Sequence, residues 1–99
     1  MSAKILEFKP RLDFSGEYAA IPLSTQIALS NYIEHGSFPG AFLLSVLSNK
    51  LTDTVLRADE NNLRAIRLIC LYIYNEIPSC TWGSGDKIYT WIRKFHPNV

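Results

Sequence analysis

"RADENNLRAIRLICLYIYNEIP", residues 57–78, carries the strongest helix signal in the chain and decides the predicted fold. Asp59 is a good N-cap residue, because its carboxylate accepts a hydrogen bond from an unpaired N–H of the first turn. Apolar residues follow at intervals of three and four, which predicts one helix with a core-facing stripe. The stripe comprises Leu63, Ile66, Cys70, Ile73 and Ile77. The half before Pro78 is apolar on nearly all sides, so we expect this helix to be central.

Two further helices are predicted before this stretch. The first covers about 24–35 and stops at Gly36, since many helices end on a left-handed glycine. The second starts at Ser37, because the proline two residues later is tolerated in a first helical turn. Whether this second helix breaks at Thr52 or continues to Leu56 stays open. The residues of the first helix expected in the core are Leu23, Ile27 and either Tyr32 or Ile33.

The two ends of the chain complete the predicted architecture. A last helix is expected from Ser84 or Asp86 to Phe95, with an apolar face at i, i+3, i+4 and i+7. That face comprises Ile88, Trp91, Ile92 and Phe95. Near the N-terminus, apolar residues at even spacings around Pro10 predict an extended arm whose phenylalanines pack on the body or on a partner. These residues are Leu6, Phe8, Leu12 and Phe14. The expected fold is all-α: a compact bundle of about four helices in residues 21–99, with an arm in residues 1–20.

The composition is that of one small globular domain. Hydrophobic side chains make up 47% and charged side chains 19% of the 99 residues, which is ordinary globular usage. Ten basic against nine acidic side chains disfavour a protein that coats nucleic acid. No window approaches the roughly 18 apolar residues of a membrane span, and the charged N-terminus differs from a signal peptide. We expect a soluble cytoplasmic protein that does not associate with membranes.

A polar and basic cluster surrounds the start of the central helix. Arginine side chains bind phosphate and carboxylate groups in a bidentate manner, so the cluster predicts a site for a macromolecular partner. Its members are Arg57, Asp59, Asn61, Arg64 and Arg67, with Asn62 beside them. The competing interpretation is structural: the acidic residues Asp59 and Glu60 cap the helix and pair with the arginines.

The loop "SCTWGSGD", residues 79–86, leads into the last helix and offers a second candidate site. A helix N-terminus presents unpaired N–H groups to an anion, and a neighbouring tryptophan can stack on a base. The anion- or nucleotide-binding candidates are Trp82, Gly83, Ser84, Gly85 and Lys87. The spacing is not that of a P-loop. The structural alternative is a flexible turn with a capping serine and a tryptophan in the core.

No catalytic or metal-binding motif is present. The histidines, His35 and His96, stand far apart, and no HExxH, CxxC, GxSxG or GxGxxG pattern occurs. We therefore expect a protein that is not an enzyme and needs neither metal nor cofactor. A helix-turn-helix interpretation is disfavoured, because its recognition helix would carry only Lys50 as a basic residue. Nucleic acid is consequently a less favoured partner than protein.

Several longer stretches occur in one order: "LSNYIEHGSFPGAFLLSVLSNKL", "RADENN" and "YIYNEIPSCTWGS", followed by Trp91-Ile92. Over residues 21–92 this series resembles small, mostly uncharacterised proteins of tailed bacteriophages and bacterial prophages. The chain departs from them at residues 37–38, where another proline is common, and at Lys50, where an acidic residue is common.

The resemblance implies a virus-encoded protein that acts in the cytoplasm of a bacterial host. By analogy we expect a small protein that binds a host macromolecule stoichiometrically, such as a defence or nucleic-acid-processing complex. One alternative is a nucleotide-binding protein that uses the loop at Trp82–Lys87. Another is a structural or assembly partner, including a homo-oligomer.

Overall fold

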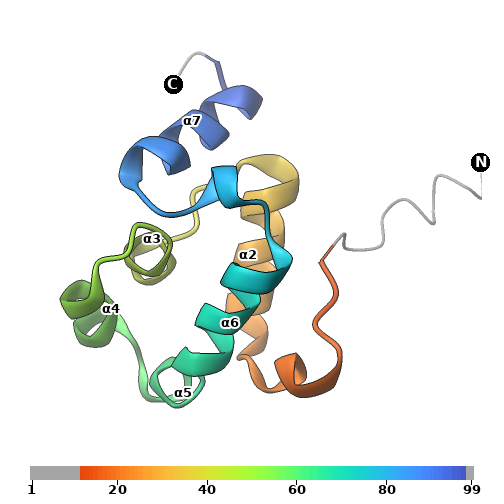
Figure 1. The fold of residues 1–99 in the computed structure, drawn as a ribbon, viewed down its shortest axis with the longest axis vertical. Helices are drawn as coiled ribbons and strands as arrows, with labels where there is room; N and C mark the ends of the chain where they lie inside the picture. Colours follow the sequence, from red (N-terminus) through yellow and green to blue (C-terminus); the bar gives the residue numbers. More distant parts are fainter. Residues whose placement is uncertain (1–11, 98–99) are drawn as a thin grey trace, which may run out of the picture.

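The computed structural model describes residues 12–97, and every regular element in that range is helical (Figure 1). The all-α prediction is thus confirmed. Six α-helices are present in this range, where about four were predicted, because two predicted helices are each divided. The elements are η1 (Gly16–Ala20), α2 (Leu23–His35), α3 (Ala41–Leu47), α4 (Leu51–Arg57), α5 (Glu60–Arg64), α6 (Ile66–Glu76), η2 (Ser79–Thr81) and α7 (Gly85–Phe95), of which η1 and η2 are 3-10 helices.

The predicted second helix is divided into α3 and α4 at Asn49. This residue has a left-handed φ of 64°, and the N–H of Lys50 donates to the carbonyl of Ser45 at 2.9 Å. The helix therefore breaks, which answers the question that the sequence left open. Its predicted start at Ser37 is wrong: Gly40 has a φ of 90°, which keeps the residues before it out of α3.

The predicted central helix is divided into α5 and α6 at Ala65. The carboxylate of Asp59 accepts from the N–H of Asn62 at 2.8 Å, so the predicted N-cap is confirmed. At Ala65 the backbone departs from helical geometry (φ −98°, ψ 8°), and its N–H is shared between the carbonyls of Asn61 and Asn62. This tight turn separates α6 from α5.

The side of α6 that faces the core differs from the predicted stripe. Leu63 is 44% exposed and Cys70 is exposed, so their predicted burial is wrong, whereas Ile73 and Ile77 are buried as predicted. Ile66 is partly buried. The buried residues of this region are Asn62, Ala65, Ile69, Tyr72, Ile73 and Ile77. Because the sequence of α6 is apolar on nearly all sides, more than one stripe has helical spacing, and periodicity alone does not choose between them.

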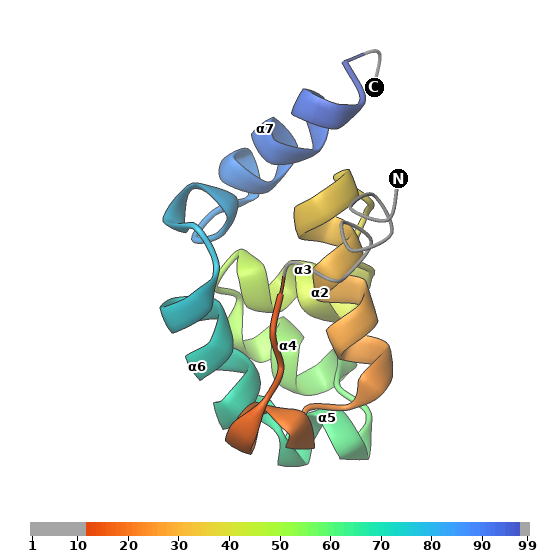
Figure 2. The ribbon, with the colours of Figure 1, turned by 90° about the vertical axis from the view of Figure 1, so that its right-hand side faces the viewer.

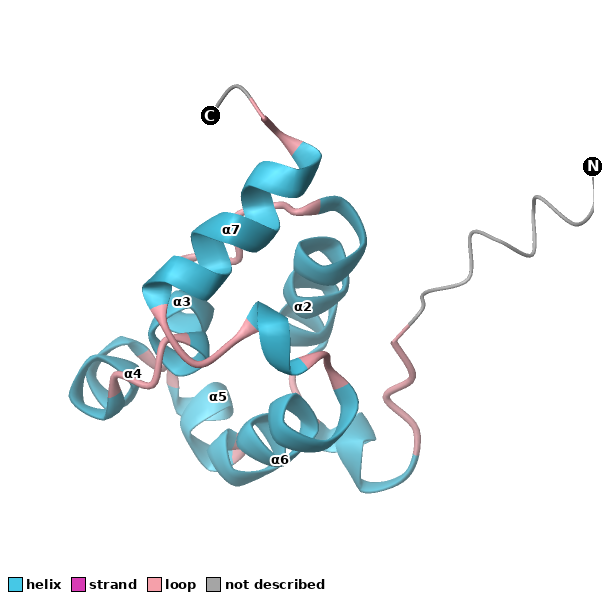
Figure 3. Ribbon diagram, turned by 45° about the horizontal axis from the view of Figure 1, so that its top comes forward, coloured by secondary structure: helices cyan, strands magenta, loops and turns pink. Residues whose placement is uncertain are grey.

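Helix α2 ends at Gly36 as predicted, with a left-handed φ of 64°. A Cβ at this position would collide with the ring of Phe95, so glycine allows α7 to pack against the end of α2 (Figure 3). The predicted burial of Leu23 and Ile27 is wrong, since these side chains are 68% and 51% exposed. The buried residues of α2 are Thr25, Leu29, Tyr32 and Ile33.

Three hydrogen bonds, two of them buried and one partly buried, join α2 to distant parts of the chain. The hydroxyl of Tyr32 donates to the carbonyl of Thr81 at 2.8 Å, and the indole N–H of Trp91 donates to the carbonyl of Tyr32 at 2.9 Å. The hydroxyl of Thr25 donates to the amide oxygen of Asn62 at 2.5 Å, between two buried side chains. Polar residues thus lie on the core side of α2 and α5, where a hydrophobic pattern does not predict them.

The segment before η1 packs on the body between α2 and α6 (Figure 2). The ring of Phe14 stacks on Tyr72, with centroids 4.3 Å apart and planes 16° apart, and Tyr18 meets Tyr72 edge-on at 4.8 Å. The prediction that Phe14 docks on the body is therefore confirmed. Phe8, the other predicted anchor, lies outside the described residues.

Candidate functional site

Helix α6 exposes apolar residues as well as burying them. Ile69, Tyr72 and Ile73 face the core, while Tyr74 is 72% exposed and Cys70 is also exposed on the outer side. We define the α6 face as the outward residues of this helix together with the tryptophan beside them: Ile66, Arg67, Cys70, Leu71, Tyr74 and Trp82. An exposed tyrosine and thiol beside partly buried apolar side chains mark a surface suited to a partner.

The wider of two grooves on the α6 face has a volume of about 370 Å³ and is lined by Arg67, Cys70, Leu71, Tyr74 and Trp82. The rings of Tyr74 and Trp82 meet edge-on with centroids 5.9 Å apart, which forms an aromatic wall. The indole Nε1 of Trp82 is buried and has no hydrogen-bond acceptor among the described residues. A buried donor without an acceptor is costly, so this N–H lowers the stability of the packing around Trp82.

A narrower groove of about 160 Å³ lies on the other side of Cys70, between α6 and the α3–α4 turn. It is lined by Val46, Asn49, Lys50, Leu51, Thr54, Ile66 and Cys70. Leu51 is 75% exposed. Partial burial raises the pKa of the Cys70 thiol. Cys70 is thus a small apolar contact shared by both grooves.

The predicted arginine cluster is divided between surfaces. Arg67 lines the wider groove, and Arg57 lies at the exposed end of α4. Asn61 and Arg64 instead line a depression of about 540 Å³ beside the start of α2. Arg64 also pairs with Glu60 at 3.4 Å, as the structural alternative predicted, although both side chains are about three-quarters exposed and such a pair adds little stability.

The predicted nucleotide loop uses several of its polar groups within the protein. Ser84 caps α7 by accepting from the N–H of Lys87 at 3.3 Å, and the Lys87 ammonium lies 3.4 Å from the carbonyl of Ser79. The N–H of Gly83 donates to the carbonyl of Leu47. Gly85 is the first residue of α7. Of the five candidates, Trp82 is the one that lines a groove on the α6 face, next to Arg67 from the other predicted site.

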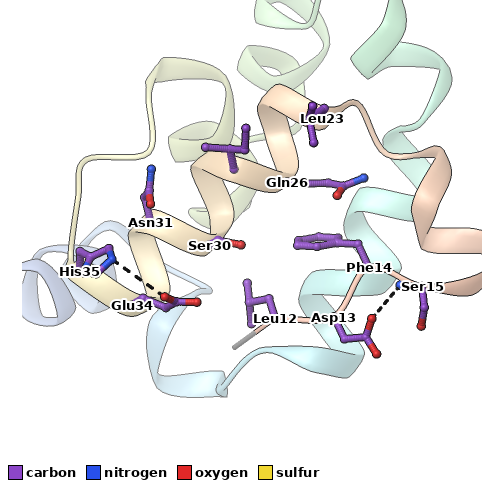
Figure 4. A pocket seen from close by; sticks show the side chains of 11 residues that line it. Leu12, Asp13, Phe14, Ser15, Leu23, Gln26, Ser30, Asn31, Glu34 and His35 are labelled. Carbon is purple, nitrogen blue, oxygen red and sulfur yellow. Dashed lines mark hydrogen bonds and ion pairs between the residues drawn. The ribbon is translucent and has the colours of Figure 1, made fainter. Parts of the chain in front are cut away.

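A separate α2 cleft of about 600 Å³ lies between the 12–15 segment and α2 (Figure 4). Leu12 and Phe14 form one wall and the exposed Leu23 and Ile27 lie on the other, with Asp13, Glu34 and His35 toward its ends. In Figure 4 the ring of Phe14 points toward α2. The imidazole of His35 lies 3.9 Å from the Glu34 carboxylate. The sequence did not predict this cleft, because its α2 residues were assigned to the core.

Neither a metal site nor a membrane-spanning helix is found in the described part of the chain. No group of three or more potential metal ligands is present among residues 12–97. None of the helices described is both long and apolar enough to cross a membrane. Comparisons with protein-family models, with curated proteins and with solved structures found no match to this chain.

Proposed function

We propose that this protein is a small binding protein that acts stoichiometrically on a macromolecule of a bacterial host, and that the α6 face contacts the partner. The observation that carries this proposal is the solvent-exposed aromatic and basic groove on α6. Tyr74, Trp82 and Arg67 are of the three residue types that dominate the binding energy of protein interfaces. The apolar residues between them supply the water-excluding surroundings that such anchors need.

The identity of the host partner is proposed from the resemblance to bacteriophage and prophage proteins. A virus-encoded chain of this size acts most simply by occupying a surface of a larger complex, without a reaction of its own. A defence complex or a nucleic-acid-processing complex of the host is the proposed target. The small net charge and the predominantly apolar groove favour a protein surface of that complex over its nucleic acid.

Nucleotide binding by the loop at Trp82–Lys87 has weaker support. Its best feature is Trp82, which lines a groove and can stack on a ring. The hydrogen bonds of Gly83 and Ser84 within the protein leave fewer donors for phosphate than the sequence suggests. Calorimetry with mono-, di- and cyclic nucleotides tests it directly: tight binding that is lost in Trp82→Ala would replace the macromolecular proposal.

Affinity capture of the tagged chain from host cells, with quantitative mass spectrometry, tests the proposal through two matched pairs of variants. Tyr74→Glu and Leu23→Glu each place a charge at an apolar position of similar exposure, 72% and 68%, on the α6 face and in the α2 cleft respectively. Arg67→Glu and Arg64→Glu each reverse a charge, within the groove and outside it. We expect Tyr74→Glu and Arg67→Glu to lose the partner and the other two variants to retain it.

Other outcomes of the capture experiment contradict the assignment. Loss of the partner with Leu23→Glu and retention with Tyr74→Glu would place the interaction in the α2 cleft. If all four variants captured as much partner as wild type does, neither surface would contact the partner. Circular dichroism of each variant controls for folding, because all four positions are exposed and their substitution should leave the helical signal unchanged.

A further inference from the structure

We infer that the partner presents an acidic amphipathic helix to the α6 face. The inference rests on the proposed function and adds the chemistry and secondary structure of the partner element. Two observations support it: the two grooves share Cys70, and their charged lining residues are both cationic.

The dimensions of the α6 face fit a short helix. From Ile66 to Tyr74 the face spans eight residue steps, which corresponds to about 12 Å or rather more than two helical turns. The grooves lie on either side of Cys70, so a partner needs at least two apolar anchors along one line. A helix with apolar residues at i, i+3, i+4 and i+7 presents such a line, and helix-in-groove recognition uses this spacing. The larger anchor belongs in the 370 Å³ groove and the smaller one in the 160 Å³ groove.

The charge of the lining selects an acidic partner. Lys50 lines the narrower groove and Arg67 the wider one. The nearby carboxylate of Glu60 pairs with Arg64, and neither groove has an acidic residue among its lining residues. Asp or Glu residues beside the apolar anchors of the partner would meet Lys50 and Arg67.

Selection from a library of random 16-residue peptides displayed on an unrelated carrier, with the full chain as bait, tests this inference. The enriched peptides that bind wild type but not Tyr74→Glu should share apolar residues at helical spacing and carry Asp or Glu between them. Their affinity should fall about tenfold when Lys50→Glu and Arg67→Glu are combined in the bait, because two favourable charge pairs become repulsive. A bait with Arg64→Glu is the matched control and should bind as wild type does.

Nuclear magnetic resonance of the labelled protein with one enriched peptide provides a second readout without substitution. The indole N–H resonance of Trp82 should shift on binding, while that of Trp91, which donates to the carbonyl of Tyr32, should stay in place. Circular dichroism of the peptide should show helix formation in the complex.

The outcomes separate the inference from the proposed function. Peptides that depend on Tyr74 but are basic, neutral or extended would overturn the acidic-helix inference and leave the binding function intact. Selection of no peptide family that depends on Tyr74 would count against both. A concentration-dependent dimer in sedimentation, abolished by Tyr74→Glu, would assign the face to a second copy of this chain and overturn the inference.

Discussion

The orientation of α6 predicts that substitution of Ile69 lowers the free energy of unfolding far more than substitution of its neighbour Cys70. Ile69 is 0% exposed and belongs to the core, whereas Cys70 is exposed and shared by the two surface grooves. The stripe predicted from sequence spacing placed Cys70 on its centre line and counted Ile69 among the apolar residues that widen it. Ile69→Ala and Cys70→Ala therefore distinguish the observed orientation from the predicted one.

The expected loss for Ile69→Ala follows from its complete burial. The substitution removes three buried carbons, worth roughly 2.4 kcal/mol at about 0.8 kcal/mol each, before any cost of the cavity left behind. The total should fall within about 2–5 kcal/mol, a large fraction of the stability of a domain of this size. In a protein of about 100 residues each kcal/mol lowers Tm by about 4–8 °C. Cys70→Ala should stay within about 0.5 kcal/mol of wild type, as exposed substitutions do.

Urea unfolding followed by far-ultraviolet circular dichroism measures both free energies of unfolding. The m-values should agree with that of wild type, so that midpoint shifts report stability alone. A loss for Cys70→Ala that equals or exceeds the loss for Ile69→Ala would refute the orientation of α6 and, with it, the exposed groove.

Three further predictions concern the fold. Gly36→Ala and Gly16→Ala should each cost about 1–2 kcal/mol, because both glycines have left-handed backbones. Gly36→Ala should cost clearly more in urea unfolding, because only its Cβ would collide with the ring of Phe95; equal losses would contradict that packing. Thr25→Val and Asn62→Leu should each cost about 1–3 kcal/mol, because each leaves the other residue's buried polar group without its partner. The double variant should cost less than the sum of the two; additive losses in thermal unfolding would exclude the buried hydrogen bond. Burial raises the pKa of Tyr72 from 10 to about 12, so its contribution to stability is present below pH 10 and should decline as the pH rises from 10 to 12. Tyr72→Phe should make the fall in stability over this pH range less steep; an unchanged slope would contradict the burial of the Tyr72 hydroxyl.

Local signals in the sequence predicted the ends of several helices correctly. Gly36 stops α2, Asp59 caps α5, and Ser84 caps α7, each through groups that lie within a few residues of one another. Such caps depend on short-range hydrogen bonds, which a sequence records directly. Phe14 was also identified as an anchor, because a phenylalanine in an extended arm has few other means of leaving water.

The orientation of the helices could not be predicted in the same way. Burial of Thr25 depends on Asn62, which lies 37 residues later in the chain, and no hydrophobic pattern places these polar residues in the core. The breaks at Asn49 and Ala65 alter the direction of the chain within stretches whose spacing suits a continuous helix. For the same reason the sequence assigned Cys70 to the core and missed the α6 face, although it singled out Arg67 and Trp82 separately.

Alkylation of the two cysteines in the partner complex tests the central claim, that the α6 face contacts the partner, most directly. Both thiols are exposed in the free chain, and Cys70 lies at the centre of the face while Cys80 lies in η2, outside both grooves. Mass spectrometry after a short treatment with an alkylating reagent gives the rate for each thiol, alone and in the purified complex. We predict that the complex slows alkylation of Cys70 at least tenfold, a factor of ten being about 1.4 kcal/mol of protection, and leaves the rate at Cys80 unchanged. Alkylation of Cys70 at its free rate, in a complex that remains intact, would contradict the claim.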